Sequence, residues 1–412
     1  MTAQGANVSA PPASLVNDGL ARRNAVLLAC AQALGGASAS IVIASASLVG
    51  ASLLGADKSL ATLPVSCFVL GTAFGALPAG AIMHRFGRRA GFVGSAALGI
   101  LAGLLSAHAI FEANFLLFCL GTMGSGIVSA FAHQYRFAAA DTASEAFKPK
   151  AISFVLAGGV AAGIVGPQTV INTADLFEPV MFAGTYVAQA ALSLVSLCIV
   201  AFVSIPRPPR GPVADGSRRP LAVIMAQPRF IVAAACAITS YALMSLVMTA
   251  TPLAMIACGL TQTDAAHAIQ WHVLAMFGPS FFTGHLIARY GKERIVIIGL
   301  SLLAACAVVA LSGVEVGHFW IALILLGLGW NFGFIGATAM LTDVYRPSER
   351  NTVQSVNDFL VFGFVAAASF SSGALLQYQG WATINTLVFP FTLACLGLIV
   401  WLVRFEKGRA IG

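Results

Sequence analysis

The stretch GAIMHRFGRR, residues 80–89, returns in altered form as GHLIARYGKE, residues 284–293. Both copies have glycine at the first and eighth positions and arginine at the sixth, which pairs Gly80, Arg85 and Gly87 with Gly284, Arg289 and Gly291. The offset between the copies is constant at 204 residues (284 − 80). Each copy separates two apolar runs, so the repeat marks corresponding points in two halves of one chain.

The composition around this repeat is that of a membrane protein. Of the 412 residues, 58% are apolar and only 9% are charged, whereas about 25% are charged in a soluble domain. Apolar runs of roughly 20 residues, enough to cross a bilayer, occur twelve times and lack the alternation of a barrel strand. The sequence therefore predicts an all-α polytopic membrane protein with twelve transmembrane helices, at about 25–48, 60–83, 90–109, 114–137, 150–172, 183–204, 229–251, 264–287, 294–313, 318–340, 352–375 and 381–403.

One polar interruption, Pro206 to Gln227, divides the helices into two sets of six. The predicted organisation is a disordered cytoplasmic lead, an N-terminal six-helix bundle, a cytoplasmic linker and a C-terminal six-helix bundle, over residues 1–21, 22–205, 206–227 and 228–412. With this helix count, Lys58 is the one basic residue of 22 outside the cytoplasmic side. Because cytoplasmic loops are rich in Lys and Arg, both termini are predicted to be cytoplasmic. The net charge of +7 then reflects topology and not nucleic-acid binding.

The repeated loop motif and the two sets of six helices resemble the major facilitator superfamily over the whole chain. The resemblance implies a transporter whose two bundles rock about a central site, and no catalytic triad or phosphate loop indicates an enzyme. It also implies a cytoplasmic gate at the motif residues Gly80, Arg85, Gly87, Arg88, Arg89, Gly284, Arg289 and Gly291. Their glycines are expected to let neighbouring helices approach closely. Asp358 is a candidate partner for the arginines, or equally a solvated acid at a helix start.

Two pairs of soft ligands lie in the second half. Met244 and Met248 share one helix face at i, i+4 spacing, and His272 and Met276 do the same on the next helix. Thioether and imidazole groups suit Cu(I), so these four residues are predicted to bind the metal. Weaker candidates along the same path are Cys236, Met255 and Cys258. The alternative is that the methionines only fill gaps in apolar packing.

The Met and His spacing resembles the CcoA-type copper importers, a bacterial branch of the superfamily. That resemblance implies import of copper across the inner membrane for haem–copper oxidase assembly, with delivery to a cytoplasmic copper chaperone. A proton-coupled efflux pump for small organic compounds is the alternative. The stretch GGVAAGIVGPQ, residues 158–168, resembles a Gly-Pro signature of such pumps, although close helix packing explains it equally well. His133, Tyr135 and Arg136 could line the cavity, or Arg136 could reach toward the cytoplasm.

Overall fold

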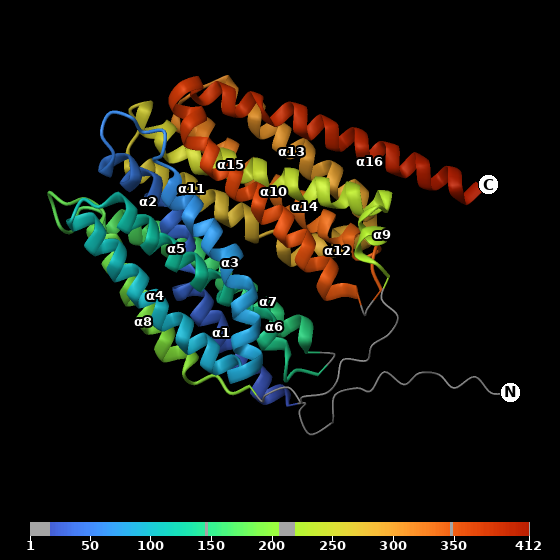
Figure 1. Ribbon diagram of the computed structural model, residues 1–412, viewed down its shortest axis with the longest axis horizontal. Coiled ribbons are helices and arrows are strands. Elements are labelled where there is room, and N and C mark those ends of the chain that lie inside the picture. The colour runs from blue at the N-terminus through green and yellow to red at the C-terminus, as the bar shows by residue number, and fades with distance from the viewer. Residues whose placement is uncertain (1–16, 145–146, 206–218, 347–348, 412) are drawn as a thin grey trace.

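The computed structural model describes residues 17–144, 147–205, 219–346 and 349–411, and the regular elements in these ranges are α-helices (Figure 1). The first half of the chain forms α1 (Asp18–Gly35), α2 (Ala37–Leu53), α3 (Leu63–Phe86), α4 (Arg88–Phe111), α5 (Phe115–Ala132), α6 (Tyr135–Ala140), α7 (Lys148–Thr173) and α8 (Ala183–Val200). The second half forms α9 (Leu221–Met225), α10 (Pro228–Ala257), α11 (Gln262–Phe277), α12 (Ser280–Tyr290), α13 (Lys292–Ser312), α14 (Val316–Leu341), α15 (Arg350–Thr386) and α16 (Val388–Ile411).

Several transmembrane spans are broken helices. The first span bends at Gly36 between α1 and α2, the fourth is interrupted between α5 and α6, and the eighth is interrupted by Gly278 and Pro279 between α11 and α12. Proline lacks the amide hydrogen that a continuous helix needs, which accounts for the break in the eighth span. With the short α9 left aside, the described helices make twelve spans, so the predicted fold class is confirmed.

Length and composition alone identify fewer spans than the fold contains. By these measures nine helical stretches among the described residues could cross a membrane. One of them, Thr352–Lys407, contains two spans, because the chain reverses at Gly380, whose φ is 82°, and α16 returns along α13 (Figure 1). The remaining two spans are α3 and the broken pair α11 and α12.

The motif glycines act through backbone conformation. Gly87 and Gly291 have φ values of +88° and +89°, a region that L side chains rarely adopt, and each forms the turn between two consecutive helices. At Gly80 and Gly284, by contrast, an added Cβ would meet no atom within 4 Å. The prediction that these two glycines permit close helix packing is therefore wrong in this structure.

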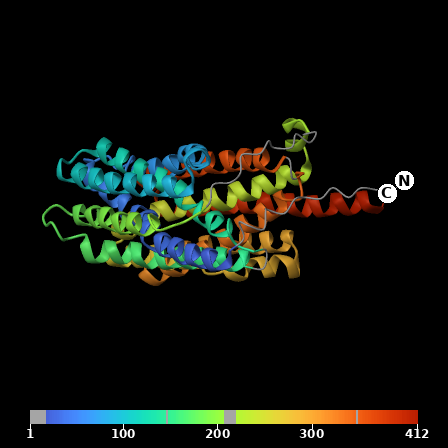
Figure 2. The same cartoon turned by 90° about the horizontal axis from the view of Figure 1, so that it is seen from below.

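The helices gather into two bundles, α1 to α8 and α10 to α16, seen from two sides in Figures 1 and 2. Hydrogen bonds join the bundles near the end of α3 that lies opposite the repeated motif. There the backbone amide of Gly373 donates to Thr62 Oγ1 at 3.2 Å, and Ser66 Oγ donates to Ser369 Oγ at 3.1 Å. The bundles diverge toward the end at which α16 finishes (Figure 1).

Two predicted boundaries differ from the structure. Residues 18–21 are helical and do not belong to a disordered lead, because Asn17 Oδ1 accepts a hydrogen bond from the Leu20 amide at 3.0 Å and caps α1. The predicted linker contains the helix α9. The rest of the predicted lead, residues 1–16, and the predicted linker over 206–218 lie outside the described residues, so the division at 205 stays a prediction.

Candidate functional site

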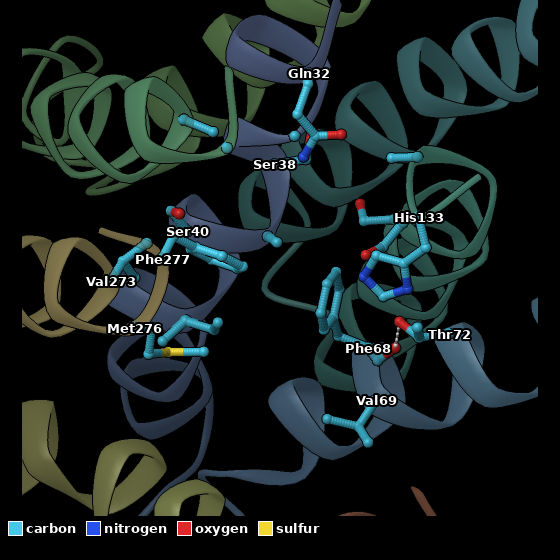
Figure 3. A pocket seen from close by; sticks show the side chains of 18 of the residues that line it. Gln32, Ser38, Ser40, Phe68, Val69, Thr72, His133, Val273, Met276 and Phe277 are labelled. Carbon is cyan, nitrogen blue, oxygen red and sulfur yellow. Dashed lines mark hydrogen bonds between the residues drawn. The ribbon is translucent and has the colours of Figure 1, made fainter. Parts of the chain in front are cut away.

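A cavity of about 270 Å³ lies between the two bundles. Its walls come from α1, α2, α3, α5, α6 and α7 on one side and from α10, α11, α14 and α15 on the other. Figure 3 shows Met276 and Phe277 on one side, with Phe68, Thr72 and His133 on the other. The volume is close to the lower end of the range for small-molecule sites, about 300–1,000 Å³.

The wall from the first half carries most of the polar groups of the cavity among apolar residues such as Ile43, Phe68 and Leu156. It presents hydroxyl, amide, imidazole and guanidinium groups from Gln32, Ser38, Ser40, Thr72, His133 and Arg136. Thr72 Oγ1 is used within the bundle, since it donates to the carbonyls of Phe68 at 3.0 Å and Gly126 at 3.1 Å. His133 and Arg136 are exposed and lie at the break between α5 and α6. Both side chains are thus accessible from the cavity, and the Arg136 guanidinium lies 4.8 Å from the centroid of the Phe137 ring.

The wall from the second half is apolar and aromatic. Tyr241, Met244 and Met248 come from α10, Met276 and Phe277 from α11, and Trp330 from α14. The aromatic rings support one another: Tyr241 lies edge-on to Trp330 with centroids 5.3 Å apart, and Trp330 stacks on Phe334 at 5.4 Å. Aromatic pairs of this kind form rigid surfaces, so this wall suits a flat apolar ring.

The predicted copper ligands do not all face this cavity. Met244, Met248 and Met276 line it, which agrees with the i, i+4 spacing for the first pair but not for the pair of His272 and Met276. His272 is fully buried outside the lining, and its Nδ1 lies 2.9 Å from the Leu323 carbonyl oxygen of α14. The structure thus brings three thioethers together and directs the imidazole toward a neighbouring helix.

The weaker candidates also lie outside the cavity lining. Met255 and Cys236 are fully buried in α10, whereas Cys258 is exposed at the end of that helix. Of the first-half candidates, Tyr135 packs edge-on against Phe92 with centroids 4.7 Å apart. His133 and Arg136 alone of that group reach the cavity.

The charged residues of the repeated motif pair within their own bundles. Arg88 bonds Asp141 through its Nε and through Nη2 at 3.1 Å, and Lys292 Nζ lies 2.5 Å from Asp343. Lys292 stands 204 residues after Arg88 (292 − 88) and Asp343 stands 202 after Asp141 (343 − 141), so the two pairs are equivalent. Burial raises the pKa of Asp141 above its ordinary value, although Arg88 acts in the opposite direction.

Asp358 has a different partner from the one that the motif suggested. The positive charge that acts on Asp358 is that of Arg136, in the other bundle. Asp358 also accepts a hydrogen bond from the Asn357 side chain at 3.4 Å. Arg85 and Arg289 instead lie over the rings of Phe86 and Tyr290. The proposed pairing of Asp358 with the motif arginines is thus absent from the described residues, and the acids that serve the motif were missed.

The second half carries further ion pairs at this end. Arg229 Nη2 lies 2.7 Å from Glu406 and 3.0 Å from Glu293, and Arg229 Nη1 lies 2.8 Å from Asp343. Arg219, which lies within the predicted linker, donates to Glu349 through Nε at 3.0 Å and through Nη2 at 2.7 Å. Those bonds lower the pKa of Glu349 below its ordinary value. The ion pairs of Arg219 and Arg229 thus connect the start of the second bundle to α15 and α16.

Comparison with known proteins decides the family. The family model described as Major Facilitator Superfamily matches residues 28–357 and 233–411. The chain belongs to this superfamily. It is therefore a multi-pass membrane transporter and not an enzyme, as predicted.

Relatives within the superfamily differ in how closely they match. The chain is 51% identical over 392 residues to the riboflavin transporter RfnT of Brucella anthropi, covering 95% of this chain and 98% of the relative. It is 28% identical over 415 residues to the uncharacterized transporter YddS of Bacillus subtilis, covering 95% and 93%. Among solved structures, a mutant of the nucleoside transporter NupG matches with a TM-score of 0.69 at 13% identity, covering 92% of this chain and 99% of that one. The last likeness concerns the fold alone.

The prediction of copper import is wrong. A relative that is 51% identical over almost the whole chain is a riboflavin transporter, and this finding overturns the resemblance to the CcoA-type importers, the copper substrate and the copper chaperone. The physical reason is that spacing placed the thioethers correctly but did not decide their chemistry. Thioethers also serve as apolar contacts for organic ligands. The alternative prediction, a proton-coupled efflux pump for small organic compounds, agrees better with the comparison in its class of substrate.

Proposed function

We propose that this protein transports riboflavin across the bacterial inner membrane by alternating access through the cavity between its two bundles. The observation that carries the proposal is the 51% identity to a riboflavin transporter over 95% of the chain. At that level of identity, two chains of one fold commonly keep the same site architecture, so the substrate class is the natural first hypothesis.

The chemistry of the cavity supports the same proposal. Riboflavin joins a flat three-ring system, apolar at one end and hydrogen-bonding at the other, to a chain of hydroxyl groups. The cavity offers an aromatic and thioether wall opposite a wall of amide, hydroxyl, imidazole and guanidinium groups. Sites for organic ligands combine a mostly apolar lining with a few placed polar groups. In this proposal Met244, Met248 and Met276 contact the substrate as apolar groups.

The charge pairs at the cytoplasmic end are proposed to govern opening of that end. Arg88 with Asp141 and Lys292 with Asp343 each join two helices of one bundle. Pairs of this kind keep the helix ends of a bundle together as it moves against its partner. Asp358 and Arg136 attract each other between the bundles and are proposed to draw the bundles together when the cavity opens outward.

Counterflow in proteoliposomes tests the proposed substrate without assumptions about direction or driving force. Purified protein is reconstituted in vesicles filled with unlabelled riboflavin, and labelled riboflavin is added outside. We expect transient accumulation of label, absent from protein-free vesicles and suppressed by external unlabelled riboflavin but not by Cu(I) or Ag(I). Vesicles that contain correctly folded protein and show no accumulation would contradict the proposal.

A further inference from the structure

The two walls of the cavity differ in chemistry, and riboflavin has two chemically different ends. Its benzenoid ring carries methyl groups and no hydrogen-bonding atoms. Its pyrimidine-like ring presents two carbonyl acceptors and one N–H donor between them. A substrate of this kind has one orientation in which each end meets a wall that suits it.

The first-half wall supplies both kinds of partner that the pyrimidine-like ring needs. Arg136 is exposed toward the cavity, and its guanidinium offers several N–H donors in a fixed plane, suited to paired acceptor oxygens. Gln32 is half-buried in the same wall, points into the cavity in Figure 3, and offers a carbonyl oxygen that can accept from the substrate N–H. Asp358 supplies negative charge near Arg136 from the other bundle, which lowers the cost of holding this cation within the membrane.

Among the described residues, the second-half wall presents no charged group to the cavity, and its hydrogen-bonding side chains are those of Tyr241, Ser245 and Trp330. The Trp330 Nε1 is buried away from the cavity surface. Met276 and Phe277 project side by side toward the cavity (Figure 3). The polar neighbour Asn331 is occupied, since its amide nitrogen donates to the Met276 carbonyl at 2.6 Å and to Ser280 at 2.8 Å. A polar substrate edge placed against Met276 would lose hydrogen bonds to water that the thioether does not replace.

We propose that the cavity holds riboflavin in one orientation, with Arg136 and Gln32 reading the pyrimidine-like ring and Met276 and Phe277 contacting the methylated benzenoid ring. These residues are then specificity determinants for opposite ends of the substrate. The inference rests on the proposed function, because it assumes that riboflavin is transported.

Two analogues of riboflavin distinguish the two ends. One carries a methyl group on the pyrimidine nitrogen, which removes the donor and adds bulk. The other carries a dimethylamino group in place of the 8-methyl group, which enlarges the benzenoid end. In counterflow, each analogue competes with labelled riboflavin, and the ratio of its inhibition constant to that of unlabelled riboflavin is measured for each variant. The amount of folded protein cancels in such a ratio.

In Met276→Ala we expect the ratio for the 8-dimethylamino analogue to fall about tenfold, because the smaller side chain makes room for the larger group; differences of this size in an apolar pocket have effects of about this magnitude. The ratio for the N-methyl analogue should stay unchanged. In Gln32→Ala we expect the reverse, a fall of about tenfold in the N-methyl ratio alone. Phe277→Ala is a second variant for the first arm. Controls are Met340→Ala, buried in α14 outside the cavity lining, and Gln377→Ala, exposed on α15, which should leave both ratios unchanged.

The outcomes separate the orientation from the proposed function. Swapped responses, or variants that alter both ratios equally, would overturn the orientation while wild-type exchange of riboflavin still stands. A wild-type protein that exchanges no riboflavin would remove the proposed function itself, and the orientation with it.

Discussion

The two halves of the molecule share a backbone plan at the ends that carry the repeated motif but differ where they meet around the cavity. Gly87 and Gly291 make the same turn, and Arg88 and Lys292 pair with equivalent acids. In the cavity, by contrast, the first half presents polar groups and the second half presents aromatic rings and thioethers. The repeat therefore preserves the turn and the charge pairs next to it, whereas the walls of the cavity have diverged; in our proposal they hold different ends of one substrate.

The largest effect is expected at the polar wall. Arg136→Gln should raise the inhibition constant of unlabelled riboflavin in counterflow by about tenfold to a hundredfold. This is the size of effect expected when hydrogen bonds to a charged group are lost. Arg136→Lys should recover only part of this, because an ammonium lacks the planar fork of donors. Arg404→Gln, exposed on α16, is the control. Normal competition by Arg136→Gln would show that the polar wall does not recognise the substrate.

Loss of a charge pair beside the repeated motif should slow transport more in the first half than in the second. Asp141→Asn removes the acid that Arg88 contacts, whereas in Asp343→Asn the neighbouring Arg229 keeps Glu293 and Glu406. We expect the counterflow rate to fall about fivefold in the first variant and less than about twofold in the second. Equal losses would indicate that the ion pairs of the second half do not compensate for one another.

Acidification should destabilise the second half by protonating Glu349. Hydrogen bonds from Arg219 lower the pKa of Glu349 below its ordinary value of 4.5, so its contribution to the free energy of unfolding is present above that pH and is lost as the pH falls below it. Glu349→Gln should reduce the melting temperature at pH 7 and flatten its decline on acidification. An unchanged pH dependence in this variant would show that the Arg219 contact does not stabilise the fold.

The smallest effect is expected at the apolar wall. Met244→Leu conserves volume and should cost less than about 1.5 kcal/mol, so riboflavin counterflow should stay near the wild-type rate, with or without a Cu(I) chelator. Met340→Leu, buried in α14, should behave the same way. Abolished counterflow in Met244→Leu alone, with normal protein levels, would show that its sulfur has a role that an apolar contact does not explain.

Much of the fold follows from local patterns. The apolar runs and the repeat at Gly80 and Gly284 predict twelve spans, and the Gly278 and Pro279 pair explains one of the breaks. What spacing cannot show is which groups meet from distant parts of the chain. His272 bonds a carbonyl on the helix of Leu323, and Arg88 pairs with Asp141. The same limit applies to the site, because spacing placed Met244 at the cavity without distinguishing a metal ligand from an apolar wall.

A structure of the purified protein with riboflavin bound tests the central claim most directly. We expect the three-ring system to lie in the cavity between the bundles, with its pyrimidine-like ring toward Arg136 and Gln32 and its methylated ring against Met276 and Phe277. An empty cavity at saturating riboflavin, or riboflavin bound elsewhere on the protein, would contradict the account.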